Sequence, residues 1–260
     1  MLIHADPTSP VVVVKAVLFD YGGTLVKEKK PWKQMMPTAI YSAYRVLKRA
    51  GLALAFEEYT EVNDSVFQKY ALLELEENED IPDIVAYQEI VDTLFRSEAK
   101  TWRKRVAAKA EDAFWATATK NFVLKSGTRL ALRKLKAMKL SMAVLSNHHY
   151  PKAEIEHLNK LGIASYFSRI MISAQVGLRK PDPRFFVMCL ASMNVRPQQA
   201  MFIGDSLTYD VEGAKRAGMY SVLVAGNGAA RQDKSGVVPD FVVHDLLEVP
   251  YIVSSLSDEP

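Results

Sequence analysis

The feature that most restricts the fold of this chain is a nearly continuous apolar run, Val11–Phe19, that ends at Asp20. β-Branched and other apolar residues dominate the run, which is typical of a strand buried on both faces. Strands of that kind belong to parallel sheets that helices cover on both sides. Gly22, Gly23 and Thr24 follow the aspartate and predict a tight backbone turn at the end of the strand.

The chain from Ser126 onward alternates between strand and helix patterns. Short apolar runs predict strands, and amphipathic stretches that end near glycine predict helices. The expected strands are Leu140–Leu145, Ile170–Ser173, Ala200–Ile203, Ser221–Val224 and Phe241–Val243, and the expected helices are Thr128–Met138, Pro151–Leu161, Pro183–Met193 and Leu207–Ala217. This alternation predicts an α/β fold with a doubly wound parallel sheet.

Residues 30–122 show a different pattern, in which apolar residues recur at helical spacing. Ile40, Ala43, Tyr44 and Leu47 form the first of four such stripes. The segment therefore predicts a helical bundle inserted after the first strand. We expect a core domain made of residues 11–29 and 123–260, a helical cap domain of residues 30–122, and a flexible N-terminal arm of residues 1–10.

The composition favours a globular enzyme and excludes several other classes. The 260 residues carry a formal net charge of +3, and the basic residues are scattered in short clusters typical of solvated faces, so no nucleic-acid partner is expected. No apolar run is long enough for a membrane span, and no secretion signal is recognisable at the start. Cys189 is the single cysteine, which excludes an intramolecular disulfide and favours a cytoplasmic location.

Polar residues follow the predicted strands at what would be one edge of the sheet. In open parallel sheets, functional groups gather where the strands end at their carboxyl side. The residues expected there are Asp20, Ser146, Asn147, Lys180, Asp205 and Asp210. Any one of them alone could be a helix cap or a turn residue. Together, the carboxylates suit Mg²⁺, and the lysine and hydroxyl suit a phosphoryl group.

Four segments carry a resemblance to a known family. Val17–Leu25 resembles the first motif of the haloacid dehalogenase superfamily, and Leu145–Asn147 resembles the second. Gly177–Pro183 resembles the third motif, and Phe202–Asp210 resembles the fourth. Each motif alone is weak, but the four in this order are specific. The resemblance covers the chain from about residue 14 to 250, and it implies a Rossmann-like core with a helical cap.

The resemblance implies a nucleophile and a metal site. Asp20 would attack phosphorus and carry the phosphoryl group. The carboxylates of Asp20 and Asp205 and the backbone carbonyl of Gly22 would hold Mg²⁺. Asp210 would belong to the same metal site, where it would order a metal-bound water or position Lys180.

The same resemblance implies a phosphate-binding set. Ser146, the amide of Asn147 and Thr24 would bind the phosphoryl oxygens. Lys180 would neutralise the charge on Asp20 and on the phosphoryl group, so it is counted among both the catalytic and the phosphate-binding residues.

One position departs from the family pattern. Phosphatases of the family usually carry a second aspartate two residues after the nucleophile, as general acid and then base, and Gly22 stands there in this chain. General acid–base catalysis contributes about a hundredfold to ten-thousandfold. The leaving group could instead be stable as an anion, as in an acyl phosphate, or His148, His149 or a cap residue could supply the proton. Both histidines are expected near a helix start and facing solvent.

The preferred function is a Mg²⁺-dependent phosphatase that acts on a small phosphorylated metabolite, because a cap of this size favours small molecules. Two alternatives remain. One is a weakly active or non-catalytic phosphate-binding regulatory protein with the same fold. The other is a metal-independent haloacid dehalogenase, against which Asp205 argues, since halide displacement gains nothing from a metal ligand. The sequence predicts no oligomeric state.

Overall fold

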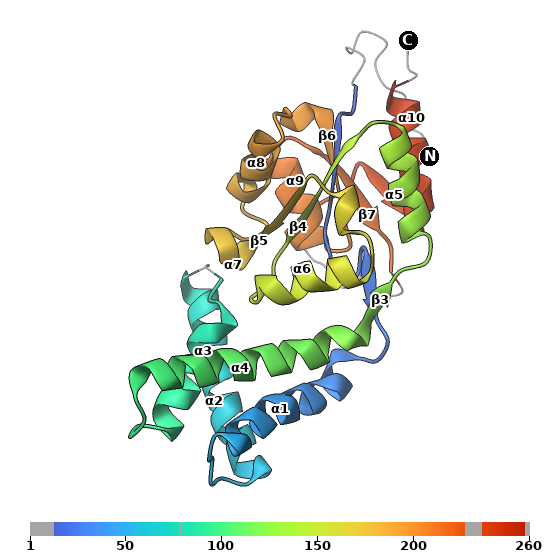
Figure 1. Cartoon of the computed structure of the whole chain (residues 1–260). Helices are drawn as coiled ribbons and strands as arrows, with labels where there is room; N and C mark the ends of the chain where they lie inside the picture. Colours follow the sequence, from blue (N-terminus) through green and yellow to red (C-terminus); the bar gives the residue numbers. More distant parts are fainter. Residues whose placement is uncertain (1–12, 78–79, 227–235, 258–260) are drawn as a thin grey trace.

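The computed structural model of the protein describes residues 13–77, 80–226 and 236–257. A helix-covered parallel sheet forms one end of the molecule, and a group of four helices forms the other (Figure 1). The arm predicted for residues 1–10 lies outside the described residues.

The core is a six-stranded parallel sheet with strand order β5-β4-β1-β6-β7-β8. Its strands are β1 (Ala16–Phe19), β4 (Ser141–Ser146), β5 (Arg169–Ile172), β6 (Ala200–Gly204), β7 (Tyr220–Val224) and β8 (Phe241–Val243). Its helices are α5 (Thr128–Ala137), α6 (Pro151–Lys160), α7 (Ser173–Val176), α8 (Pro183–Ser192), α9 (Glu212–Arg216) and α10 (Val249–Ser257). The predicted doubly wound α/β fold is confirmed.

β1 lies in the middle of the sheet and supplies side chains to both of its faces. Val17 and Phe19 pack into an apolar cluster with residues of α5, α6 and α10. Ala16 and Leu18 pack into a second cluster with residues of α8 and α9. Because successive strand residues point to opposite faces, a wholly apolar strand sequence is what this central position requires.

Two expected elements differ in the structure. The first strand begins at Ala16, because only Ala16–Phe19 pair with β4 and β6, and Val13 before them is exposed. Of the run predicted from Val11, the first two residues lie outside the described residues. The helix predicted for Leu207–Ala217 starts with a π-helical turn, Leu207–Val211, and continues as α9. π-Helical turns are frequent at functional sites.

Four helices between β2 and β3 share a separate hydrophobic core. They are α1 (Trp32–Arg49), α2 (Phe56–Glu77), α3 (Asp83–Leu94) and α4 (Lys100–Ala118). Ala43 and Leu47 of α1, Tyr87 of α3 and Ala107 of α4 are among its buried members. The four predicted helices are confirmed, and the division of the chain into domains at residues 29/30 and 122/123 stays a prediction.

A short two-stranded ribbon that the sequence analysis missed lies at this junction. β2 (Val26–Glu28) pairs antiparallel with β3 (Phe122–Leu124). Three-residue strands are too short to show a period of two, which explains why the pattern gave no sign of them. The ribbon connects the four helices to the sheet (Figure 1).

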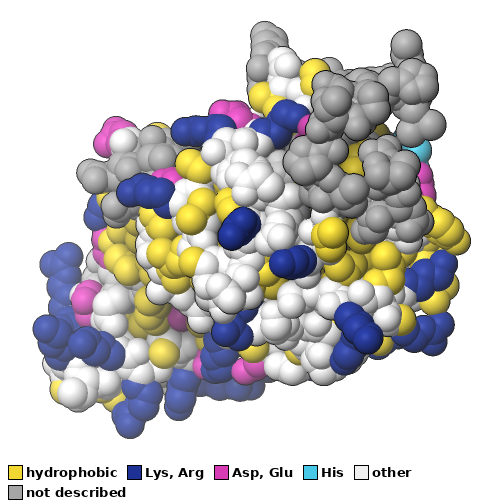
Figure 2. Space-filling model, turned by 90° about the horizontal axis from the view of Figure 1, so that it is seen from above, with side chains coloured by type: hydrophobic (Ala, Val, Ile, Leu, Met, Phe, Trp, Pro, Cys, Tyr) yellow, Lys and Arg dark blue, Asp and Glu magenta, His cyan; other side chains and the backbone are white. Residues whose placement is uncertain are grey.

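α6 touches both hydrophobic cores. Its Leu158 belongs to the sheet cluster, whereas its Ala153 packs with the four-helix group. On the face of the molecule seen in Figure 2, many Lys and Arg side chains lie along the margins, and a few lie singly among apolar and uncharged surface nearer the middle. No helix in the described part of the chain is both long and apolar enough to cross a bilayer.

Gly213 of α9 is required by packing. A Cβ at this position would lie 2.5 Å from the ring of Phe186 and 3.2 Å from the Cα of Pro181. We expect Gly213→Ala to lower the free energy of unfolding by about 1–3 kcal/mol, although alanine favours helix by about 1 kcal/mol. Urea unfolding followed by circular dichroism measures the change.

Gly226 is the matched control, because a Cβ there meets no atom of the described residues within 4 Å. Gly226→Ala should change the free energy of unfolding by less than about 0.5 kcal/mol. Equal stability of the two variants would contradict the packing described for Gly213.

Candidate active site

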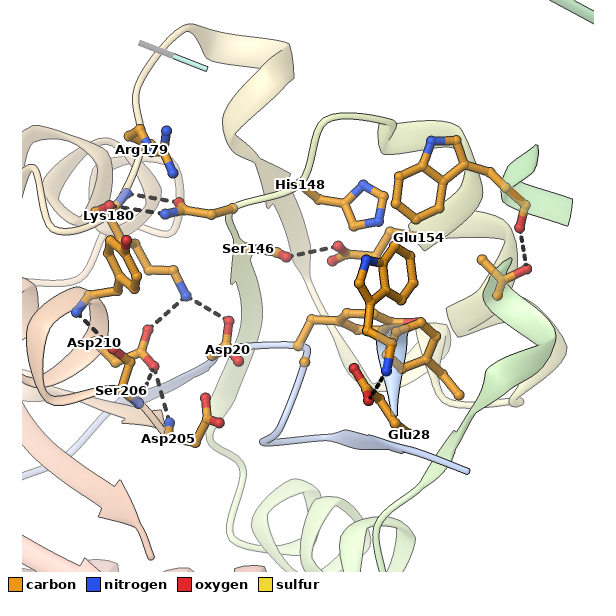
Figure 3. Close-up of a pocket in the computed structure, with 18 residues that line it drawn as sticks. Asp20, Glu28, Ser146, His148, Glu154, Arg179, Lys180, Asp205, Ser206 and Asp210 are labelled. Carbon is orange, nitrogen blue, oxygen red and sulfur yellow. Dashed lines mark hydrogen bonds and ion pairs between the residues drawn. The ribbon is translucent and has the colours of Figure 1, made fainter. Parts of the chain in front are cut away.

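A buried lysine between two aspartates forms the centre of the site. Lys180 Nζ lies 2.6 Å from Asp20 Oδ1 and 2.7 Å from Asp210 Oδ1 (Figure 3). Asp20 follows β1, Lys180 precedes α8, and Asp210 lies in the π-helical turn after β6. All three side chains are buried. The structure thus brings together residues from three of the four motif segments.

Asp210 is fully engaged by neighbouring protein groups. Its Oδ1 accepts from Lys180, and its Oδ2 accepts from the backbone N–H groups of Asp205 and Ser206, both at 3.0 Å. A Cβ at residue 204 would lie 2.3 Å from the Asp210 carboxyl group, so Gly204 is required for this approach. The geometry gives Asp210 the role of holding Lys180 and the turn after β6.

Three carboxylates lie close enough together to hold a metal ion. Oxygens of Asp20, Asp205 and Asp210 all lie within 4.8 Å of one another. Burial raises the pKa of Asp20 above its usual range, against the lowering effect of Lys180, and burial together with Asp210 raises the pKa of Asp205 to about 6. One ammonium group cannot neutralise three carboxylates, so the donor set fits a hard divalent cation.

The turn after Asp20 packs directly on the Asp205 carboxylate. Gly23 has a φ of +74°, and a Cβ there would lie 2.0 Å from Asp205 Oδ2. Lys125, just after β3, donates from Nζ to the Gly23 carbonyl at 2.7 Å. The glycine was visible in the sequence, whereas Lys125 was missed because a single lysine after a three-residue strand carries no pattern. Both residues hold the turn beside the carboxylates.

The residues expected to bind phosphate are partly occupied by protein contacts. The side chain of Asn147 accepts from the Lys180 backbone N–H at 2.8 Å and donates to the Lys180 carbonyl at 2.9 Å. It therefore fixes the lysine loop, and only its backbone amide remains for the expected role. Thr24 is buried, its hydroxyl has no hydrogen-bond partner, and it does not line the cavity.

Ser146 contacts a carboxyl group that the sequence analysis missed. Its Oγ lies 2.8 Å from Glu154 Oε2, and both side chains are buried. Burial raises the pKa of Glu154 to about 8, Ser146 lowers it, and the charge on Asp20 raises it. A signal was present in the sequence, because Glu154 precedes the apolar Leu158 of the predicted helix by four residues and so shares its buried face.

The site opens into a cavity of about 410 Å³ between the sheet edge and the four helices. Its walls include the carboxylates, Lys180, Ser146 and Gly22. Side chains that the sequence analysis did not assign to the site complete the lining: Tyr21, Glu28, Trp32, Trp115, Thr119, Phe122, Glu154, Arg179, Ser206 and Tyr209. Trp115 is buried in the core of the four helices, and it also lines the cavity.

The two histidines, both expected to face solvent, lie in different surroundings. His148 lines the cavity and packs on Trp115, with ring centroids 4.5 Å apart. Its Nδ1 accepts from the Tyr150 backbone N–H, and burial lowers the pKa of His148 to about 3. His149 does not line this cavity, and its Nδ1 lies 3.1 Å from Glu74. His148 is half-buried and faces the cavity and the Trp115 ring, so the expectation that it faces solvent stays a prediction.

The chain is similar in sequence to proteins that are named as phosphatases. Phosphoserine phosphatase from Thermus thermophilus is 40% identical over 110 residues, which cover 42% of this chain and less than half, 43%, of that protein. Glyceraldehyde 3-phosphate phosphatase from Methanopyrus kandleri is 26% identical over 253 residues, which cover 95% of this chain and 100% of that protein.

A solved structure shows the same fold over nearly the whole chain. The 2-haloacid dehalogenase from Pseudomonas syringae superposes with a TM-score of 0.68 at 20% identity, and the match covers 93% of this chain and 99% of that chain. The model of the haloacid dehalogenase-like hydrolase family matches residues 14–218. That match spans all four segments that carry Asp20, Ser146, Lys180 and Asp205. The chain therefore belongs to the haloacid dehalogenase-like hydrolase family.

Proposed function

We propose that this chain is a Mg²⁺-dependent phosphatase that hydrolyses a small phosphorylated molecule through an aspartyl-phosphate on Asp20. The observation that carries the proposal is the buried contact of Lys180 with Asp20 at 2.6 Å, beside two further carboxylates and a cavity. A carboxylate held next to a fixed positive charge is suited to attack phosphorus, because position and charge supply most of the catalysis of phosphoryl transfer.

The reaction has two steps. In the first, a carboxylate oxygen of Asp20 forms a bond to phosphorus as the bond from phosphorus to the leaving oxygen breaks. In the second, water attacks the phosphorus of the aspartyl-phosphate, which releases inorganic phosphate and restores the carboxylate. Lys180 offsets the negative charge in both steps, and Ser146 and the Asn147 backbone amide donate to phosphoryl oxygens.

Asp20, Asp205 and the backbone carbonyl of Gly22 are the residues that would hold the metal ion. When bound, Mg²⁺ offsets the charge of the phosphoryl oxygens and of the carboxylates. Asp210 was expected to belong to the metal site. Because both of its oxygens are already hydrogen-bonded, we assign it the second expected role, which is to position Lys180.

The proton for the leaving group needs a source other than the usual second aspartate, because Gly22 stands at that position. His148 is neutral at physiological pH because burial lowers its pKa to about 3, and His149 does not line the cavity. Neither histidine is suited to act as the general acid. We therefore propose that the enzyme favours leaving groups that are stable as anions, such as those of acyl phosphates and aryl phosphates.

The substrate class is proposed from the cavity and from the relatives. A volume of about 410 Å³ suits a small molecule rather than a protein surface. The names of the relatives refer to phosphoserine and glyceraldehyde 3-phosphate, both small phosphorylated molecules. Dehalogenation is the second candidate, since the structure that superposes is a dehalogenase. The Asp20–Asp205–Asp210 group disfavours it, because halide displacement needs no divalent cation.

Asp20→Asn should abolish the hydrolysis of para-nitrophenyl phosphate, with a loss of at least about a thousandfold in kcat, since an amide is a poor nucleophile. Chelation of divalent ions should have the same effect on the unmodified enzyme, and added Mg²⁺ should restore the activity. A colorimetric assay measures both changes.

Asp182→Asn is the matched control for this variant. Asp182 caps α8 through the Arg184 backbone N–H and does not line the cavity, and asparagine caps equally well. Its activity should stay within about twofold of the unmodified enzyme. Turnover that survives both Asp20→Asn and chelation would contradict the proposed mechanism. Binding of Mg²⁺ and phosphate without turnover on any substrate would favour the regulatory alternative.

Gly22→Asp should raise kcat/KM on alkyl phosphates by at least about tenfold, because it restores an acid that typically contributes a hundredfold or more. The position can accept a side chain, since a Cβ there meets nothing within 4 Å and its φ is not in the left-handed region. The gain on para-nitrophenyl phosphate, whose leaving group needs little protonation, should be much smaller.

Gly22→Asn separates the acid from the added bulk. It has nearly the same shape as aspartate but no proton to transfer, so it should bring no gain on alkyl phosphates. Equal rates for the Asp and Asn variants would show that the proton has another source.

A further inference from the structure

The contact between Ser146 and Glu154 has a consequence for phosphate binding. Glu154 belongs to α6, its side chain is fully buried, and its Oε2 lies 2.8 Å from Ser146 Oγ. Its other oxygen, Oε1, has no hydrogen-bond partner among the described residues. In Figure 3, Glu154 lies on the opposite side of Ser146 from Lys180. The hydroxyl therefore stands between a buried carboxyl group and the proposed phosphoryl site.

A serine hydroxyl carries one proton, so the protonation state of its neighbour decides where that proton points. An ionised carboxylate can only accept hydrogen bonds. The Ser146 hydroxyl would then donate to Glu154, and only the lone pairs of Ser146 Oγ would face the phosphoryl oxygens. A protonated carboxyl group can donate to Ser146 Oγ. The serine proton is then free to donate toward the cavity.

The surroundings of Glu154 favour the protonated form. Burial opposes a charge, and it raises the pKa of this carboxyl to about 8. The charged groups that act on it are Asp20 at the end of β1, which raises the pKa, and Lys180 before α8, which lowers it. Tyr21 also lies near, and Glu154 is one of the groups that raise the pKa of Tyr21. At neutral pH the carboxyl group therefore keeps its proton.

We propose that Glu154 is a positioning residue whose protonated carboxyl group donates to Ser146 Oγ and thereby directs the Ser146 hydroxyl to a phosphoryl oxygen. The proposal deepens the proposed function and rests on it, because it takes Ser146 as a phosphoryl ligand. The loss of the Glu154 proton withdraws this hydroxyl from the substrate and adds a buried negative charge beside it. Both effects weaken the binding of a tetrahedral dianion.

Thermodynamic linkage fixes the direction of the pH dependence. Below about pH 8 the carboxyl group is already protonated, so anion binding takes up no proton from it. Above that pH, binding requires proton uptake by Glu154, and the affinity should fall by up to about tenfold for each pH unit. Glu154→Gln cannot ionise, and its affinity should stay level over the same range.

Tungstate is a suitable probe, because it is a tetrahedral dianion whose charge is constant across this pH range. Calorimetry can measure the affinity of tungstate for the Mg²⁺-loaded enzyme from about pH 6 to about pH 9.5. The measurement is made on the unmodified enzyme and on the Glu154→Gln variant. The tungstate affinity should decline above about pH 8 in the unmodified enzyme and stay level in Glu154→Gln. A parallel decline in both proteins would overturn it, since the decline would then belong to another group.

Ser146→Ala separates hydroxyl orientation from simple charge repulsion. A hydrogen bond to a charged group contributes about 1.5–3 kcal/mol, so loss of the hydroxyl should weaken tungstate binding by about tenfold or more at about pH 6.5. At about pH 9.5 the same substitution should have an effect of less than about twofold, because the hydroxyl then points to Glu154. In the Glu154→Gln background the tenfold effect should persist at both pH values. A Ser146→Ala effect that is independent of pH in the unmodified background would overturn the proposal.

Two further measurements keep the outcomes distinct. If tungstate fails to bind at any pH, or binds with an affinity that neither Ser146→Ala nor Lys180→Met changes, the proposed function itself is contradicted.

Thermal unfolding tests the buried proton independently of binding. Because the raised pKa makes the native state of the unmodified protein lose stability between about pH 4.5 and about pH 8, Glu154→Gln should melt higher by a margin that grows across this interval. A margin that does not change with pH would contradict a buried protonated Glu154.

Discussion

The ion pairs of Lys180 are the interaction on which the rest of the site depends. An ammonium group buried to this degree requires partners, and Asp20 and Asp210 supply them at 2.6 and 2.7 Å. Burial opposes the charge, but the two carboxylates outweigh it and raise the pKa of Lys180 above its usual value. The two ion pairs also join three chain segments, because Asp20 follows β1, Lys180 precedes α8 and Asp210 lies in the turn after β6. Removal of Lys180 would leave both carboxylates buried without their common cation. Asn147 fixes the loop that carries Lys180, and the absence of a side chain at Gly204 leaves room for the Asp210 carboxyl group.

The site separates its charges into two regions. On the side of Asp205, three carboxylates outnumber the two lysines, Lys180 and Lys125, which suits a cation. On the side of Ser146, the nearby carboxyl group of Glu154 is held neutral by burial, which suits an anion. A substrate phosphate needs both conditions at once, since its oxygens must lie near a metal ion and away from uncompensated negative charge. The burial that excludes water from the Glu154 side chain therefore favours phosphate binding, because it keeps a negative charge away from the phosphoryl oxygens.

The sequence predicted what depends on a repeating pattern. The strands, the four inserted helices and the residues at the carboxyl edge of the sheet followed from hydrophobic periodicity and from motif order. It missed Lys125 and Arg179, whose positions near the site depend on how separate segments pack. It also missed the β2–β3 ribbon, because three residues show no period. For Asp210 the carboxylate was recognised, but its engagement by two backbone N–H groups became visible only in three dimensions.

The four inserted helices and the sheet meet at the same two segments that we propose to hold the phosphoryl group. Arg179, next to Lys180, forms an ion pair with Asp80 in the segment between α2 and α3 at 2.9 Å, and the Asp80 side chain is only 1% exposed. α6 packs Ala153 against the inserted helices, while Glu154 contacts Ser146. A displacement of these helices would therefore change the surroundings of Lys180 and of Ser146 together. Because a buried carboxyl group loses its proton more readily when water reaches it, the packing of α6 against the four helices is part of what favours the neutral form of Glu154.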